Sequence, residues 1–173
     1  SSQPPMAIET CAPALGFRVT RVADRRLANL VASLFDVPAP AIVTGANDVG
    51  RFVPDQAASV TSAVASKLQD VAEATAALAT QAGRPAIACS GDEAHCARAY
   101  FEKTVPRVFR RPTDAAELDA LLAVYTSGRE IHGSHAGGMG LAIAALVQSP
   151  SFLYHLDHDT PHERATRISL FLR

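Results

Sequence analysis

Tryptophan is absent from this chain and lysine is scarce, with only Lys67 and Lys103 among 173 residues. Sixteen lysines and arginines stand against seventeen aspartates and glutamates, which gives a formal net charge of −1. A chain with this balance lacks the basic surface that binds nucleic acid, so we expect no nucleic-acid partner. The sequence also has no run of about twenty apolar residues, which excludes a helix that spans a membrane.

Cysteine is scarce too, and Cys11, Cys89 and Cys96 form neither a C-x-x-C pair nor a C-x-x-C-H motif for haem attachment. Cys89 and Cys96 flank a polar loop with a flexible glycine, Gly91, that is long enough for its ends to meet at disulfide distance. We predict a disulfide between them, with two free thiols as the alternative, while Cys11 is free or pairs outside the chain. Because disulfides persist in oxidising compartments, we expect an exported protein, either periplasmic or extracellular, or associated with the cell envelope.

Strand patterns are missing as well, because no segment alternates apolar and polar residues over any length. Apolar residues recur instead at the spacing of a helix. Together with caps and prolines, this pattern predicts helices over residues 20–37, 55–81, 92–109, 114–128 and 134–148, and a further one from residue 160. Gly128 is expected to end the fourth helix and Pro106 to kink the third. The predicted fold class is all-α: a helical bundle of about five to six helices with an extended N-terminal arm.

Changes in composition predict four parts of the chain. Residues 1–17 form the extended arm, residues 18–88 an N-terminal helical subdomain, residues 89–160 a second helical subdomain, and residues 161–173 the start of a further helix or domain. Thr160 caps that last helix, which stops at Arg173 with an apolar face and no chain beyond it. We expect another polypeptide, a continuing half or a partner chain, to pack on this C-terminal helix.

The densest group of metal-ligand residue types lies near the C-terminus. His155, His158 and His162 stand there among aspartates and a glutamate. Imidazoles and carboxylates at this spacing are ligands for zinc or copper. The alternative is a solvated polar linker, in which Glu163 caps the helix that follows.

Another histidine lies four residues before a methionine, a spacing that places both on one face of a helix. His135 and Met139 offer the His/Met pair that serves as axial haem ligands in electron-transfer proteins. The alternative is a helix N-terminus that Ser134 caps, with His135 facing water.

A basic group of three arginines, Arg107, Arg110 and Arg111, precedes Pro112. It either binds an anion or pairs with Glu117 or Asp114, and we favour a structural role because an arginine at a helix corner usually fixes geometry.

Two segments carry a resemblance to a known group of proteins. Residues 108–125 begin Val-Phe-Arg-Arg-Pro-Thr-Asp-Ala-Ala-Glu-Leu, which resembles the motif F-R-R-P-L-T-x-x-E, and residues 144–156 contain Gln-Ser-Pro-Ser-Phe-Leu-Tyr, which resembles L-x-S-P-x-F-L-Y-R-x-E. Both motifs are found in exported bacterial domains of unknown function that were named from planctomycetes, also occur in myxobacteria and are commonly fused to cytochrome c-like modules. His155 stands where these proteins tend to have arginine.

The resemblance implies an exported, mostly helical protein from a haem-rich secretory context, with no reaction to carry over. We therefore expect a structural or interaction part of a haem- or electron-transfer-associated protein. The alternative is part of an oxidoreductase or a metal-dependent enzyme whose active site a missing half or a partner chain completes. No catalytic residue is identified, so we favour a non-enzymatic role for this chain alone. Haem, zinc and copper are the cofactors for which its histidines offer ligands.

Overall fold

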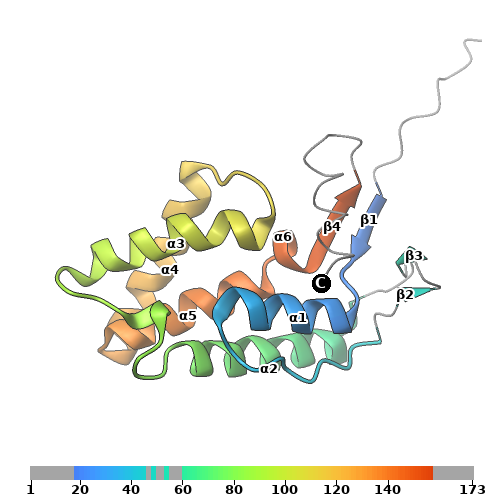
Figure 1. The fold of residues 1–173 in the computed structure, drawn as a ribbon, viewed down its shortest axis with the longest axis horizontal. Helices are drawn as coiled ribbons and strands as arrows, with labels where there is room; N and C mark the ends of the chain where they lie inside the picture. The colour runs from blue at the N-terminus through green and yellow to red at the C-terminus, as the bar shows by residue number, and fades with distance from the viewer. Residues whose placement is uncertain (1–17, 46–47, 50–52, 55–59, 158–173) are drawn as a thin grey trace, which may run out of the picture.

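The computed structural model describes residues 18–45, 48–49, 53–54 and 60–157, and Figure 1 shows their arrangement. This part of the chain is mainly helical, which confirms the predicted all-α fold class. Its helices are α1 (Asp24–Phe35), α2 (Ser62–Ala79), the 3-10 helix η1 (Pro85–Ile87), α3 (Glu93–Phe109), α4 (Ala115–His132), α5 (His135–Gln148) and α6 (Pro150–Leu153). The predicted N-terminal arm and the helix predicted from residue 160 lie outside the described residues.

Three helices begin at capping side chains that the sequence predicts. Asp92 accepts hydrogen bonds from backbone N–H groups in the first turn of α3, and Ser134 does so for α5. Asp114 and Glu117 form a reciprocal capping box at the start of α4. These side chains satisfy N–H groups that have no partner within the helix. The sequence places all three caps correctly, whereas α2 begins at Ser62, several residues later than predicted.

Two short antiparallel ribbons accompany the helices and correct the sequence prediction, which contains no strand. β1 (Arg18–Arg21) pairs with β4 (Tyr154–Asp157), and β2 (Asp48–Val49) pairs with β3 (Val53–Pro54). The first helix therefore starts at Asp24, after β1. Strands of two and four residues are too short to show an alternating pattern, and β1 and β4 meet only because the fold brings distant segments together.

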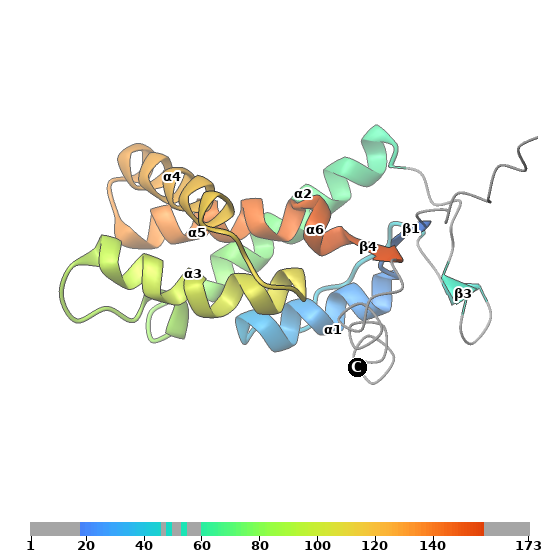
Figure 2. The same ribbon diagram turned by 90° about the horizontal axis from the view of Figure 1, so that it is seen from above.

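Helix α5 lies at the centre of the bundle, in contact with α2, α3, α4, α6 and η1 (Figure 2). Its innermost side chains are at most 2% exposed; they are Met139, Ala142, Ile143, Leu146 and Val147. Helix α2 contributes a row of buried alanines, namely Ala72, Ala76 and Ala79. Small residues of this kind let helix backbones approach one another closely.

Gly128 does not end α4, as the sequence predicts, but lies inside it; Gly133, with a φ of 65°, ends the helix. The reason is the close packing of α4 on α5. A Cβ atom on Gly128 would lie 2.8 Å from the Cβ of Leu141, and one on Gly138 would lie 2.7 Å from the carbonyl oxygen of Tyr125. Both glycines mark a helix crossing that leaves no room for a side chain.

We predict that Gly138→Ala lowers the free energy of unfolding by about 1–2 kcal/mol, because overpacking outweighs the better helix propensity of alanine. Gly140→Ala in the same helix is the matched control. A Cβ there would meet only Thr80, at 3.9 Å or more, so this variant is expected to gain up to about 1 kcal/mol. Urea unfolding of both variants checks the prediction, and equal stabilities would contradict it.

Candidate functional site

A groove of about 560 Å³ lies between the end of α1, η1 and the exposed face of α3. Helix α3 forms one wall with side chains that recur every three or four residues and therefore share one helix face. The members of this wall are His95, Cys96, Ala99, Tyr100, Lys103, Thr104 and Arg107. Because Asp92 caps α3, the first turn of this wall is fixed at its start.

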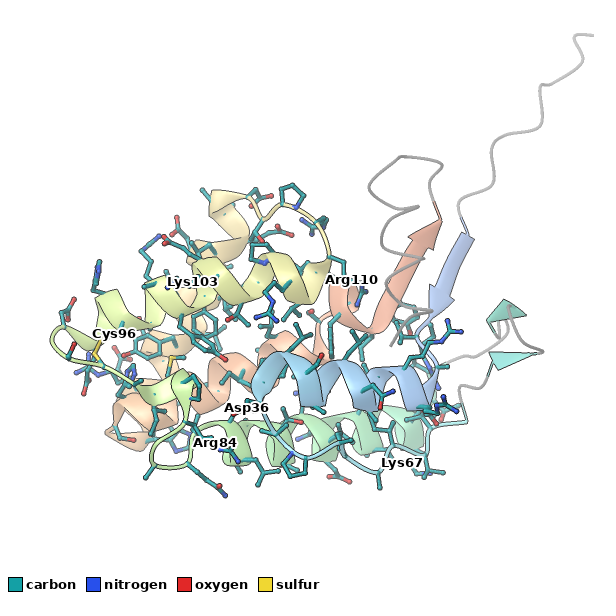
Figure 3. All side chains as sticks on the ribbon, viewed as in Figure 1. Asp36, Lys67, Arg84, Cys96, Lys103 and Arg110 are labelled. Atoms are coloured by element: carbon teal, nitrogen blue, oxygen red, sulfur yellow. A yellow bond between two sulfur atoms is a disulfide. The ribbon has the colours of Figure 1, made fainter. Side chains whose placement is uncertain are left out.

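The opposite wall comes from the end of α1 and the segment around η1. Leu34 and Phe35 lie buried at its base. Asp36 follows in the left-handed conformation, with a φ of 54°, and ends α1. Arg84 donates a 2.6 Å hydrogen bond to the carbonyl oxygen of Asp36, and its ion pair with the Asp36 carboxylate measures 3.3 Å. Figure 3 labels Asp36, Arg84 and, on the facing wall, Lys103.

The groove carries positive charge that its own walls do not neutralise. Lys103 and Arg107 are exposed, and neither forms an ion pair with any residue that the structure describes. Elsewhere the arginines of α3 and α4 are paired: Arg98 binds Asp119 at 2.9 Å. Asp36 is the carboxylate in the lining, and its charge is offset by Arg84.

Tyr100 brings a polar group to the centre of the α3 wall. The ring is half-buried and meets Phe101 edge to face. Burial raises the pKa of the Tyr100 hydroxyl, while the hydrogen bond with Thr104 and the charge of Arg107 act in the opposite direction. The hydroxyl therefore stays protonated at neutral pH and is available as a hydrogen-bond donor.

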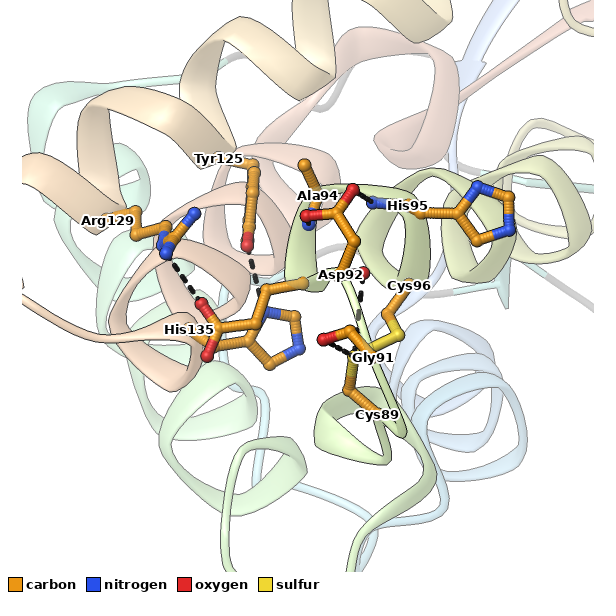
Figure 4. The surroundings of a disulfide bond; sticks show 10 residues. Cys89, Gly91, Asp92, Ala94, His95, Cys96, Tyr125, Arg129 and His135 are labelled. Carbon is orange, nitrogen blue, oxygen red and sulfur yellow. Dashed lines mark hydrogen bonds and ion pairs between the residues drawn. A yellow bond between two sulfur atoms is a disulfide. The ribbon is translucent and has the colours of Figure 1, made fainter.

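The disulfide predicted from the sequence is confirmed. Cys89 and Cys96 are bonded, with their Cα atoms 5.6 Å apart, and this excludes the alternative of two free thiols (Figure 4). The bond ties the segment after η1 to the first turns of α3. Since Cys96 also lines the groove, the disulfide holds the groove's two walls together at one end.

Next to the disulfide, α4 and α5 supply a polar cluster (Figure 4). The hydroxyl of Tyr125 lies 2.9 Å from Nδ1 of His135, and Arg129 pairs with Glu93 at 2.8 Å. Burial lowers the pKa of His135; Arg129 lowers it further and Glu93 opposes both. Of the two side chains predicted as axial haem ligands, Met139 is fully buried in the core, whereas His135 is half-buried and contacts Tyr125. Their role in haem binding stays a prediction.

The two neighbouring arginines of the basic group have different partners. Arg111 pairs with Glu117, and this hydrogen bond lowers the pKa of the Glu117 carboxyl. Arg110 instead donates to the backbone carbonyl oxygens of Ser151, Phe152 and Tyr154, at 3.2–3.3 Å. Burial lowers the pKa of Arg110 to about 10, which still leaves it charged at neutral pH. The structure thus gives both arginines contacts that fix the end of α3.

The predicted histidine cluster falls largely outside the described residues. His155 stands in β4 opposite Thr20, while His158 and His162 lie beyond the described chain. In the part of the chain that the structure describes, no group of three or more histidines, cysteines, aspartates and glutamates is placed to hold a metal ion. In the same part, every helix is too short or too polar to cross a membrane.

The sequence pattern does not predict the groove, although it contains one signal for it. Lys103 and Arg107 are four residues apart and therefore lie on the same face of α3, without an acid at the usual pairing distance on that face. The opposite wall has no comparable signal, because it depends on how α1 and η1 fold back onto α3.

Comparison with known proteins covers the later part of the chain. Residues 96–157 match the model of a family described as PSD5, a protein of unknown function (DUF1595). This similarity runs from α3 to β4, and both segments that resemble exported bacterial domains fall within it. No curated protein and no solved structure gives a significant match to the chain.

We predict that the double variant Cys89→Ala/Cys96→Ala loses about 2.5 kcal/mol of unfolding free energy. The reason is that a disulfide across this short loop restricts the unfolded chain. Denaturant unfolding with and without a reducing agent measures the loss. The reductant should destabilise the native chain by a similar amount and leave the double variant unchanged; an equal effect on both would contradict the assignment.

We predict that His135 makes the fold sensitive to acid. Because its pKa in the folded protein lies below the ordinary value of 6.5, the unfolded chain binds the proton more readily, so stability is lost as the pH falls through 6.5 toward the folded pKa. The stability advantage of the native chain over His135→Gln should therefore shrink below pH 6.5. Urea unfolding between pH 5 and 8 tests this, and a constant difference would contradict it.

Proposed function

We propose that this chain is an exported binding module, without a catalytic role of its own, that holds a partner polypeptide within a haem- or electron-transfer-associated protein. The groove beside the Cys89–Cys96 disulfide is the observation that carries the proposal. It is open, it combines an apolar base with two exposed cations, and both ends of its α3 wall are tied to the rest of the bundle.

Export is supported by the disulfide. Thiols in the bacterial cytosol are kept reduced, so a disulfide that stabilises a fold is useful mainly to proteins that reach the periplasm or the outside. The resemblance of residues 108–125 and 144–156 to exported domains points in the same direction.

The haem context is supported by that resemblance, since the similar proteins are commonly fused to cytochrome c-like modules. This chain has no C-x-x-C-H motif, so a covalently bound haem would belong to the partner. The groove is then one contact with the partner. The predicted C-terminal helix, which lies outside the described residues, is proposed as a second.

The test is an NMR titration of the isotopically labelled chain with a purified cytochrome c-like module of the kind fused to the resembling proteins. We expect saturable shifts of the backbone signals around the groove. Ala99→Leu, which adds a larger side chain to the groove wall, should weaken binding by about tenfold, because overpacking costs 1–3 kcal/mol.

Ala123→Leu is the matched control, because Ala123 is an exposed residue of α4 that does not line the groove. This variant should bind like the native chain. Shifts confined to a different face, or equal binding by both variants, would contradict the groove as the site. An absence of shifts at millimolar cytochrome would contradict the proposed partner.

A further inference from the structure

We infer that the groove takes an extended, acidic segment of a polypeptide, with two acidic side chains on alternate residues and an apolar side chain beyond them. This inference rests on the proposed function, because it names the chemistry by which the partner is recognised. Its basis is the arrangement of charge, apolar surface and hydroxyl groups on the two walls.

The spacing of the two cations fits an extended chain. Lys103 and Arg107 lie four positions apart in α3, which corresponds to about 6 Å along the helix axis. In an extended chain, alternate side chains point to the same side and are about 6.6–6.8 Å apart. Two carboxylates on alternate residues therefore match this spacing, so that each can pair with one cation.

The other end of the groove suits an apolar side chain. Ala99 and Cys96 lie one to two turns before Lys103 on the same wall, and they face the segment that contains Pro85 and Ala86. These residues are small or apolar and leave room for a side chain against the disulfide. Along α3 the whole wall from His95 to Arg107 is about 18 Å long, which accommodates about five extended residues.

The groove also offers partners for the backbone of such a segment. The Tyr100 hydroxyl lies in the middle of the wall, and the exposed Ser90 lies near the disulfide. An extended backbone has unpaired N–H and C=O groups that need such donors and acceptors. A compact inorganic anion would use the two cations but neither the hydroxyl groups nor the apolar end.

Asp36 gives the groove one negative charge, which opposes the binding of an acidic ligand. It is the carboxylate among the lining residues, and its contact with Arg84 offsets its charge without removing it. An acidic ligand is therefore attracted by Lys103 and Arg107 and weakly repelled by Asp36. Removal of the Lys103 or Arg107 charge should weaken the binding of an acidic ligand, whereas removal of the Asp36 charge should strengthen it. A merely structural role of these residues would not produce opposite effects.

The experiment uses fluorescence anisotropy with a labelled, end-capped peptide of sequence Asp-Ala-Asp-Ala-Leu. Its control peptide carries asparagine in place of both aspartates. We expect saturable binding of the acidic peptide alone, weakened by added salt as for exposed charges. Equal binding of both peptides, or of neither, would overturn the inference.

Three variants locate the site. Lys103→Gln and Arg107→Gln should each weaken peptide binding about two- to fivefold, as is typical of exposed ion pairs. Asp36→Asn should strengthen it, and asparagine tolerates the left-handed conformation at this position. Arg25→Gln, at the opposite end of α1, removes the same charge outside the groove and should have no effect. An equal loss with Arg25→Gln would show a non-specific charge effect and overturn the assignment.

Competition separates the two ligand chemistries. If acetate or inorganic phosphate displaces the peptide at concentrations similar to the Kd of the peptide, the ligand of the groove is a small anion and the inference of a polypeptide segment is overturned. The two proposals also fail separately. A cytochrome module that binds the groove while the acidic peptide does not would overturn only this inference, whereas a peptide that binds while the module ignores the groove would overturn only the proposed partner.

Discussion

The half-buried guanidinium of Arg110 connects the segments on which the rest of the structure depends. It donates to the carbonyl oxygens of Ser151, Phe152 and Tyr154, and so ties the end of α3 to α6 and the start of β4. A charged side chain is stable in such a place only when backbone dipoles compensate for the water it has lost. Together with the disulfide at the other end of α3, this contact fixes the helix that forms one wall of the groove.

The sequence was most informative where structure is determined locally. The caps Asp92, Asp114 and Ser134 act within one helical turn, so their positions could be read from neighbouring residues alone. Gly128 shows the limit of that approach. A glycine near the end of a helical pattern usually stops the helix. Gly128 instead allows α4 to cross α5 closely, and this role depends on tertiary packing that the sequence pattern does not show.

The parts of the candidate site also differ in how far the sequence predicts them. The disulfide and the α3 face were open to prediction, since both follow from spacing along a short segment. The facing wall was not, because Asp36 and Arg84 are 48 residues apart in the chain and meet only after α1 and α2 have packed. The β1–β4 ribbon was hidden for the same reason. Contacts between distant segments leave little trace in the pattern of a single sequence.

The β1–β4 ribbon determines where the chain enters and leaves the helical bundle. Arg18 pairs with Asp157, so the first and last described residues lie side by side, at the end of the bundle away from the disulfide (Figures 1 and 3). Bodies whose two connections emerge together are readily accommodated as insertions, since neither connection has to span the fold. The chain thus enters and leaves the described helical bundle at one end, and the disulfide lies at the other end.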